Sequence, residues 1–199
     1  MSAKARSSLE QYRSKRHADR TPEPMGGTSR RSGKRRFVVQ KHAATSLHYD
    51  FRLEAGGVLK SWSVPKGPST DPREKRLALR TEDHPLDYVD FEGVIPSGEY
   101  GAGAVIVWDS GTYRNLAARE GKKLPVAQGV SDGHVKVWLE GEKLRGGYAL
   151  TRTGQEGEKE RWILVKTSDE EADARRNPVS TEPASVRTGR TVEDVGEDA

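Results

Sequence analysis

Three residues that lie close together in the chain, His42, His48 and Asp50, have the chemistry of a metal site. Two neutral imidazoles and one carboxylate form a three-ligand set that leaves coordination positions open, as a catalytic metal requires. Mn²⁺, Zn²⁺, Fe²⁺ and Co²⁺ all accept such a set, and a hard phosphoryl oxygen as a further ligand favours Mn²⁺. The same pattern also fits an ordinary polar strand face with one salt bridge, so the neighbouring residues must decide.

Cationic side chains follow this set along the sequence. Arg52 lies two residues after Asp50, and its planar guanidinium can bind an anion through two parallel hydrogen bonds. Lys66, Arg76 and His84 come later, and each is ambiguous alone because a single cation or imidazole is usually solvated or structural. An unperturbed histidine pKa of about 6.5 would let His84 act as a general acid or bind an anion as an imidazolium.

Residues 47–53 must form a strand for the candidate ligands to meet. Alternate residues of a strand point to opposite faces, so the apolar and polar residues of this segment separate. The apolar face carries Leu47, Tyr49, Phe51 and Leu53, and the polar face carries His48, Asp50 and Arg52. We expect the apolar face to pack in a core and the polar face to form the site.

The rest of the central segment also predicts strands, because short alternating runs are interrupted by Gly and Pro. The expected strands are residues 37–40, 47–54, 58–64, 76–81, 103–108, 112–115, 133–139, 147–153 and 161–166. So many short strands without helical crossovers indicate an all-β fold, a small closed or nearly closed β-barrel.

Glycine-containing segments predict the turns between these strands. Residues 55–57 (Ala-Gly-Gly) and residues 109–111 (Asp-Ser-Gly) are each expected to join two strands as a tight hairpin. Residues 95–103 are rich in glycine but lack the Gly-Lys-Ser/Thr ending of a phosphate-binding loop and precede a strand, so we expect a tight turn at the barrel rim.

Charge divides the chain into three parts. Residues 1–36 hold 11 Lys/Arg against 3 Asp/Glu, whereas residues 168–199 hold 4 against 9. We predict a basic N-terminal arm (1–36), a β-barrel domain (37–167) and an acidic, disordered tail (168–199). Within the arm, residues 8–16 predict a short helix with Leu9 and Tyr12 on one side, ended by the proline-rich residues 21–24. The arm is either a solvated tail or a phosphate-binding segment.

The absence of cysteine excludes disulfides and thiolate metal sites, so a metal would have to be held by histidines and carboxylates. The sequence has no apolar run of the roughly 18 to 20 residues that a membrane span needs, and its start has no signal-peptide core. We therefore expect a cytoplasmic protein.

Taken together, these motifs resemble the 3′-phosphoesterase family, the end-healing module of bacterial ligase D in non-homologous end joining. The matching stretches are Phe-Val-Val-Gln-Lys-His at 37–42, Leu-His-Tyr-Asp-Phe-Arg at 47–52, Ser-Val-Pro-Lys-Gly-Pro at 63–68, Glu-Asp-His-Pro-Leu-Asp-Tyr at 82–88 and Gly-Glu-Tyr-Gly-Ala-Gly at 98–103. The resemblance extends from about Leu9 to Lys166.

The resemblance implies a concave active site in the barrel, with manganese held at His42, His48 and Asp50. It implies a phosphate clamp at Arg52, His84 and Tyr88, with further phosphate-binding residues at Lys66 and Arg76. The corresponding functional positions in the arm are Arg16 and Glu23. It also implies the activity. Members remove a 3′-terminal ribonucleoside to leave a 3′-phosphate, and then remove that phosphate to leave a 3′-OH. The implied substrate is a recessed or primer 3′ end on DNA.

The chain departs from the family pattern in two ways. It has no Lys-x-Asp-Gly ligase motif, so we expect a standalone monomer that serves a separate ligase and Ku. Where the family arm commonly reads Arg-Asp-Phe, this chain reads Arg-His-Ala at 16–18. We expect Arg16 either to pair with Glu23 or to stay without a fixed partner. A chain lacking residues 1–30 should keep its metal site and phosphate removal but lose much of nucleoside release, and His17→Asp should speed nucleoside release if the missing carboxylate matters.

Two other classes of function remain open from the sequence. A non-catalytic module could hold nucleic-acid ends with the same basic residues, which predicts binding that is indifferent to metal. A mononuclear metal enzyme of another substrate class, such as an oxygenase, could use the same two histidines and carboxylate. The cationic residues near the ligand set argue against an oxygenase, which needs no phosphate clamp.

Overall fold

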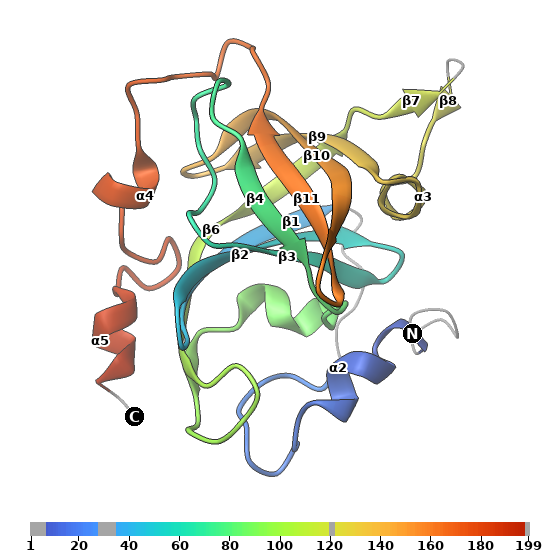
Figure 1. Cartoon of the computed structure of the whole chain (residues 1–199). Coiled ribbons are helices and arrows are strands. Elements are labelled where there is room, and N and C mark those ends of the chain that lie inside the picture. The colour runs from blue at the N-terminus through green and yellow to red at the C-terminus, as the bar shows by residue number, and fades with distance from the viewer. Residues whose placement is uncertain (1–6, 28–34, 120–121, 198–199) are drawn as a thin grey trace.

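Antiparallel strands dominate the computed structural model, which describes residues 7–27, 35–119 and 122–197 (Figure 1). The strands are β1 (Arg36–Ala43), β2 (Leu47–Ala55), β3 (Val58–Val64), β4 (Arg76–Arg80), β5 (Gly93–Ile95), β6 (Gly103–Asn115), β7 (Ala118–Arg119), β8 (Lys122–Lys123), β9 (His134–Gly141), β10 (Arg145–Glu156) and β11 (Lys159–Lys166). The helices are α2 (Glu10–Ser14), the 3-10 helix η1 (Leu86–Asp90), α3 (Val126–Asp132), α4 (Pro178–Thr181) and α5 (Val192–Gly196). Within the described ranges, none of these helices has the length and apolar character needed to cross a membrane.

Eight of the strands close into a barrel. Their order is β1-β2-β3-β4-β11-β10-β9-β6, and β6 also pairs with β1, so the last strand returns to the first. The pairings are antiparallel, and β5 adds to β6 outside the ring. Closure satisfies the backbone hydrogen bonds of both edges. The predicted all-β closed barrel is confirmed, whereas the short strands β5, β7 and β8 were not predicted.

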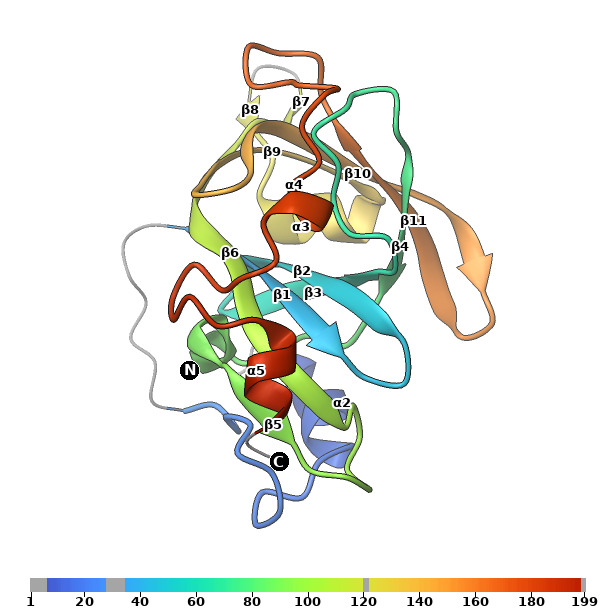
Figure 2. The ribbon, with the colours of Figure 1, turned by 90° about the vertical axis from the view of Figure 1, so that its left-hand side faces the viewer.

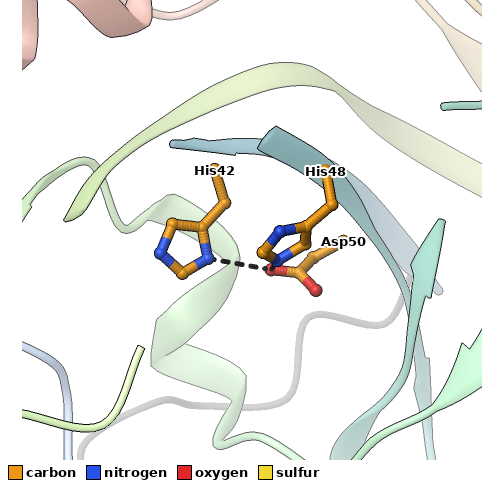
Figure 3. A group of neighbouring side chains, drawn as sticks. All are labelled: His42, His48 and Asp50. Atoms are coloured by element: carbon orange, nitrogen blue, oxygen red, sulfur yellow. Dashed lines mark ion pairs between the residues drawn. The ribbon is translucent and has the colours of Figure 1, made fainter. Parts of the chain in front are cut away.

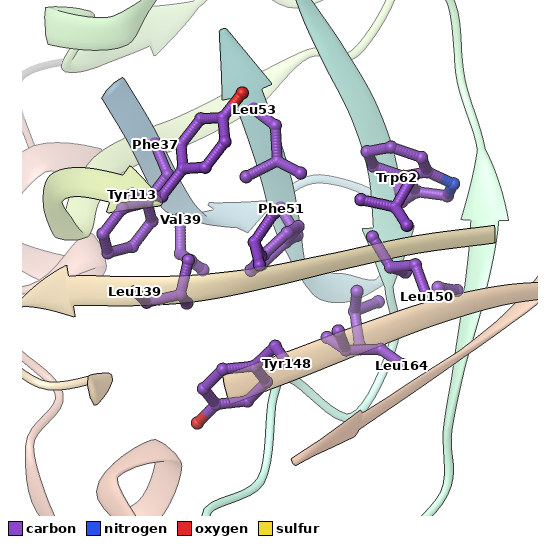
Figure 4. Packing of buried hydrophobic residues seen from close by; sticks show 14 of the residues in the cluster. Phe37, Val39, Phe51, Leu53, Trp62, Tyr113, Leu139, Tyr148, Leu150 and Leu164 are labelled. Carbon is purple, nitrogen blue, oxygen red and sulfur yellow. The ribbon is translucent and has the colours of Figure 1, made fainter. Parts of the chain in front are cut away.

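Large apolar side chains fill the barrel interior (Figure 4). Trp62 of β3 and Trp162 of β11 meet edge to face with ring centroids 5.6 Å apart, a favourable aromatic geometry. Phe51 and Leu53 of β2 are fully buried in the same core. Their neighbours in sequence therefore point to the barrel exterior, which confirms the predicted division of β2 into two faces. Leu47, at the start of β2, is half-exposed instead of buried.

The N-terminal segment and η1 cover one outer face of the barrel (Figures 1 and 2). Leu9 and Tyr12 are fully buried there, in a cluster that includes Val38 of β1, Leu59 of β3 and Tyr88 of η1. The predicted helix with two apolar residues on one side is confirmed. The arm is therefore part of the folded body and shares a core with the barrel that was expected to be a separate domain.

The hairpin predicted at residues 109–111 is wrong, because β6 runs through it without a turn. The Asp109 carboxylate is buried and accepts backbone hydrogen bonds from Glu142, Lys143 and Leu144, which follow β9. Gly111 allows a close approach of two strands, since a Cβ there would lie 2.1 Å from the Glu140 carbonyl oxygen. The hairpin predicted at residues 55–57 is confirmed between β2 and β3.

The tail, predicted to be disordered, is ordered over residues 168–197. Val192 and Val195 of α5 are buried against Ile106 of β6 (Figure 2). A reciprocal capping box between Thr191 and Asp194 begins this helix. The prediction failed because the acidic composition of the segment concealed an apolar pair at helical spacing, with its own start signal.

Candidate metal centre

His42, His48 and Asp50 meet on the outer face of the barrel (Figure 3). His42 near the end of β1 lies opposite His48 of β2 in the antiparallel register, and Asp50 follows on the same face of β2. One oxygen of Asp50 lies 3.6 Å from His42 Nδ1 and 3.7 Å from His48 Nε2. A short turn between β1 and β2 thus brings two imidazoles and a carboxylate together, as the sequence predicts.

Backbone carbonyls orient both imidazoles toward the carboxylate. His42 Nε2 lies 2.8 Å from the carbonyl oxygen of Gly101, and His48 Nδ1 lies 2.8 Å from that of Ser46. Because a carbonyl only accepts, each of these nitrogens carries a proton, and the other nitrogen of each ring is the one that faces Asp50. Such outer hydrogen bonds are the usual way in which metal-binding histidines are held.

The separations between the donor atoms suit one ion. Bonds of about 2.1 Å to a common ion place two ligand atoms roughly 3.0 to 3.4 Å apart. The three donors lie within 4.8 Å of one another, with the Asp50 oxygen at 3.6 and 3.7 Å from the two nitrogens. The Asp50 oxygen would have to approach each nitrogen by only a few tenths of an ångström, and the two imidazoles would have to move closer to each other by up to about 1.4 Å. These three residues could therefore bind a metal ion.

Asp50 is held as an anion. Burial alone would raise the pKa of its carboxyl group, but Arg52 and the two imidazoles together hold that pKa well below its ordinary value. Arg52 Nη2 lies 3.1 Å from the carboxylate. A ligand that stays charged without a bound cation is ready to receive one.

Arg52 offers an unused donor beside the candidate metal ligands. Its Nε donates to Gln40 at 2.8 Å, and Gln40 is itself fixed through its amide to the carbonyls of Tyr88 and Phe91. Its guanidinium also lies 4.9 Å from the ring centroid of Tyr88. Its Nη1 is buried and has no hydrogen-bond partner among the described residues. A buried, unpaired N–H of a fixed guanidinium is a binding point for an anion.

The arm joins the site through Arg16. Its guanidinium donates to Glu23 at 2.9 Å and to Glu82 at 3.2 Å, and it lies 3.5 Å from His84 Nε2. Glu23 in turn accepts a hydrogen bond of 2.9 Å from the Tyr88 hydroxyl. The expected pairing of Arg16 with Glu23 is present, and these residues form one buried network with His84 and Tyr88.

His84 is held neutral in this network. Burial lowers its pKa well below the ordinary value, and the nearby cations Arg52 and Arg16 lower it further. Its Nδ1 lies 2.9 Å from the carbonyl of Glu82, so Nδ1 carries the proton and Nε2 presents a lone pair toward Arg16. Both roles left open by the sequence, a general acid and an imidazolium that binds an anion, need a proton on Nε2 and are disfavoured in this state.

These residues surround one cavity of about 400 Å³. The predicted site residues that line it are Arg16, His42, His48, Asp50, Arg52, His84 and Tyr88. Glu23 does not line the cavity and acts on it through its contacts with two of the lining residues. The cavity therefore places the candidate metal ligands and the unpaired donor of the candidate anion site side by side.

Lys66 and Arg76 are not among the residues that line the cavity. Lys66 is exposed in the turn after β3, and Arg76 at the start of β4 forms an ion pair with Glu74. Because β2, β3 and β4 are antiparallel neighbours, both cations lie at the end of the sheet that carries His48. They stand outside the cavity, where only a larger substrate would reach them.

Four contributors to the site were missed by sequence reasoning: Gln40, Glu82, Tyr100 and Lys159. Gln40 gave a signal, because an amide interrupts the apolar run of β1 and a buried amide needs partners. Glu82 lies in the segment 82–88, which was singled out for His84 and Tyr88, and Tyr100 lies in the glycine-rich segment 95–103, which was predicted only to form a turn. Lys159, the first residue of β11, gave no local signal. It lines the cavity because the β10–β11 hairpin extends to the cavity.

His17 has a partner that its type alone did not reveal. Its Nδ1 lies 3.0 Å from a carboxylate oxygen of Glu99, in the loop before β6. An aspartate at position 17 would place two carboxylates together, so the expected benefit of His17→Asp is reversed. We predict that nucleoside release slows, by less than about fivefold because the side chain at position 17 is exposed. The rate of nucleoside release is measured on one ribonucleotide-ended primer for both His17→Asp and His17→Ala, which loses the pairing without adding a negative charge. Faster release by His17→Asp than by the wild type would contradict the expected repulsion from Glu99.

The fold and the site together define a closed β-barrel with three residues that could hold a metal ion and an adjacent arginine with an unpaired donor on its outer wall. The chain belongs to the DNA ligase D 3′-phosphoesterase domain family, whose model matches residues 40–152. That match contains all three candidate metal ligands, Arg52 and His84. It does not contain Arg16 or Glu23, which the structure brings to the same network.

Curated relatives extend the similarity to most of the chain. The multifunctional non-homologous end joining protein LigD of Pseudomonas aeruginosa is 49% identical over 188 residues, which cover 92% of this chain and 22% of that protein. Its namesake in Mycolicibacterium smegmatis is 44% identical over 163 residues, 81% of this chain and 21% of that protein. The multifunctional non-homologous end joining DNA repair protein LigD of Mycobacterium tuberculosis is also 44% identical over 163 residues, which cover 81% of this chain and 20% of that protein. The chain thus spans about a fifth of the length of these relatives.

Proposed function

We propose that this protein is a metal-dependent 3′-phosphoesterase that heals nucleic-acid 3′ ends. In the first step, overall, a water oxygen forms a new bond to phosphorus as the bond to the 5′-oxygen of a terminal ribonucleoside breaks, which releases the nucleoside with a 5′-OH and leaves a 3′-phosphate. In the second step a water oxygen again bonds to phosphorus as the bond to the 3′-oxygen breaks, which leaves a 3′-OH and releases inorganic phosphate. The observation that carries the proposal is that Arg52, whose Nη1 is buried and unpaired, lines the same cavity as His42, His48 and Asp50.

The donor set of two imidazoles and a carboxylate suits Mn²⁺, and Zn²⁺ or Co²⁺ can replace it. A bound divalent ion would supply Lewis acidity to a phosphoryl oxygen. Arg52 would bind the same phosphoryl group through its unpaired N–H and stabilise the charge that develops on it. Arg16 lies beside His84 and, through its ion pairs with Glu23 and Glu82, connects the site to the arm.

The family and the relatives support DNA ends as the substrate. A primer or recessed 3′ end that carries a ribonucleotide or a 3′-phosphate presents the required phosphoester, and a separate ligase and Ku would act on the healed end. The relatives named above are non-homologous end joining proteins, which supports a place in double-strand break repair. That role would place the protein with the DNA, in the cytoplasm of bacteria such as these.

The test is incubation of a labelled duplex primer with a 3′-phosphate, with and without Mn²⁺, followed by sizing of the product. We expect loss of the phosphate only when the metal is present. Binding without turnover, with or without metal, would instead favour an end-binding module. Activity that needs Fe²⁺ and leaves the phosphate intact would favour a different metal enzyme.

The terminal ribose gives a second test of the same proposal. If its 2′-OH takes part as a nucleophile or as a metal ligand, an all-deoxy end should resist nucleoside removal while a 3′-phosphate on DNA is still removed. The measurement compares nucleoside release from two primers that differ only in the 2′ position of the last residue. Equal rates would remove the 2′-OH from the mechanism.

We predict that His84→Ala lowers 3′-phosphate removal at least about tenfold more than nucleoside removal. A terminal phosphomonoester carries more negative charge than a diester, so it depends more on Arg16, which His84 contacts. The rates of both steps are measured for the variant and for His134→Ala, an exposed histidine on β9 outside the cavity. Equal losses in both steps would assign His84 to a shared role.

A further inference from the structure

Tyr100 is an exposed aromatic side chain at the candidate active site. It lines the cavity with 43% of its surface exposed, and among the described residues it is the one aromatic side chain that is both large and exposed. The next residue, Gly101, supplies the carbonyl that orients His42. An exposed aromatic ring is thus directly connected to a candidate metal ligand.

The ring is held in place before any substrate arrives. Lys15 Nζ lies 3.4 Å from the Tyr100 hydroxyl and 4.7 Å from the ring centroid. The Arg16 guanidinium lies 5.4 Å from the same centroid. Both cations are anchored by the carboxylate of Glu82. A fixed ring loses little conformational entropy when a ligand covers it, which favours binding.

The ring lies where the sugar and base of a substrate would extend from a phosphate bound at the candidate metal ligands. The candidate metal ligands are nearly buried, with 7% exposure for His42 and 6% for Asp50, whereas Tyr100 lies at the open side of the cavity. A phosphate bound at the deep end must extend its sugar and base toward the open side. An aromatic face there is suited to a nucleobase, since every base has a π-face that can stack on it.

We propose that Tyr100 is a stacking platform for the base of the 3′-terminal nucleoside, an inference that rests on the proposed function. Stacking does not read hydrogen-bonding groups, so the platform accepts all four bases and favours any base over an abasic end. From alanine substitutions at other stacking sites, the preference amounts to about tenfold in affinity. The cavity would therefore select a complete terminal nucleoside without selecting its sequence.

The test is a cycle of two primers and four proteins, measured as equilibrium binding by fluorescence anisotropy in EDTA so that no turnover occurs. The primers end in a ribonucleotide or in the matching abasic ribose. The proteins are the wild type, Tyr100→Phe, Tyr100→Ala and Leu47→Ala. Leu47 is a matched control because it is equally exposed but does not line the cavity.

We expect the terminal base to strengthen binding about tenfold in the wild type, Tyr100→Phe and Leu47→Ala, and to have no effect in Tyr100→Ala. A base preference that survives in Tyr100→Ala, or that is absent from the wild type, overturns the platform. Because the assay needs no catalysis, a wild type that shows the preference but fails to cleave would refute the proposed enzyme and leave the platform standing. A wild type that binds neither primer would refute both.

Discussion

Asp50→Asn is expected to abolish both nucleoside and phosphate removal while the barrel stays folded. The amide retains the shape of the side chain but loses the negative charge that lies between His42 and His48 and 3.1 Å from Arg52. Loss of an outer hydrogen bond to a metal ligand already costs roughly 10- to 100-fold in metal affinity, so we expect a larger loss for a ligand itself. The measurements are Mn²⁺ affinity by calorimetry and the two cleavage rates at saturating metal.

The control is Asp132→Asn, an exposed aspartate in α3 that lies outside the cavity. It should bind metal and cleave like the wild type. His42→Ala and His48→Ala should behave like Asp50→Asn, because all three are interpreted as ligands of one ion. Near-normal Mn²⁺-dependent activity in any one of these variants would remove that residue from the centre.

Deletion of residues 1–30 is expected to abolish both reactions, which is a larger effect than the sequence alone predicts. The deletion removes Leu9 and Tyr12, which are fully buried in the cluster between the arm and the barrel. Truncation of one buried leucine or aromatic residue costs roughly 2 to 5 kcal/mol, so loss of both would consume much of a typical domain stability. Thermal unfolding and phosphate removal are measured on the truncated chain.

A charge control separates this structural role from simple attraction to DNA. Arg13→Ala with Arg20→Ala removes two exposed cations of the arm and leaves its buried residues intact. We expect this double variant to unfold at the wild-type temperature and to lose only a few-fold in activity at low salt. A truncated chain that melts and removes phosphate like the wild type would show that the arm is a solvated tail after all.

The strand pattern was predictable because β2 alternates so regularly that its faces could be assigned without a structure. The same reasoning failed at residues 109–111, where an aspartate, a serine and a glycine imitate a turn. Asp109 serves there as a buried hydrogen-bond acceptor for another loop, and Gly111 permits close strand contact. Local composition does not reveal such long-range partners. A glycine that forms a turn and a glycine that permits close contact between strands therefore look alike in sequence.

The candidate metal-binding group was predictable because its members are close in sequence and two of them, His48 and Asp50, share one face of β2. The network around it was only partly predictable. Glu23 and Tyr88 are 65 positions apart, yet they share a hydrogen bond. Arg16 reaches His84 across a similar separation. The packing of the arm against η1 brings these residues together, and no spacing in the sequence encodes it.

The two faces of β2 also constrain how the gene can change. Odd-numbered residues such as Phe51 pack in the barrel, while the even-numbered His48 and Asp50 belong to the metal centre. Insertion or deletion of one codon within this strand would send the ligands into the core and the core residues to the surface. Point substitutions on either face leave this alternation intact, but a change in the number of residues in the strand does not. Among descendants of this barrel, β2 should therefore vary in composition and hardly at all in length.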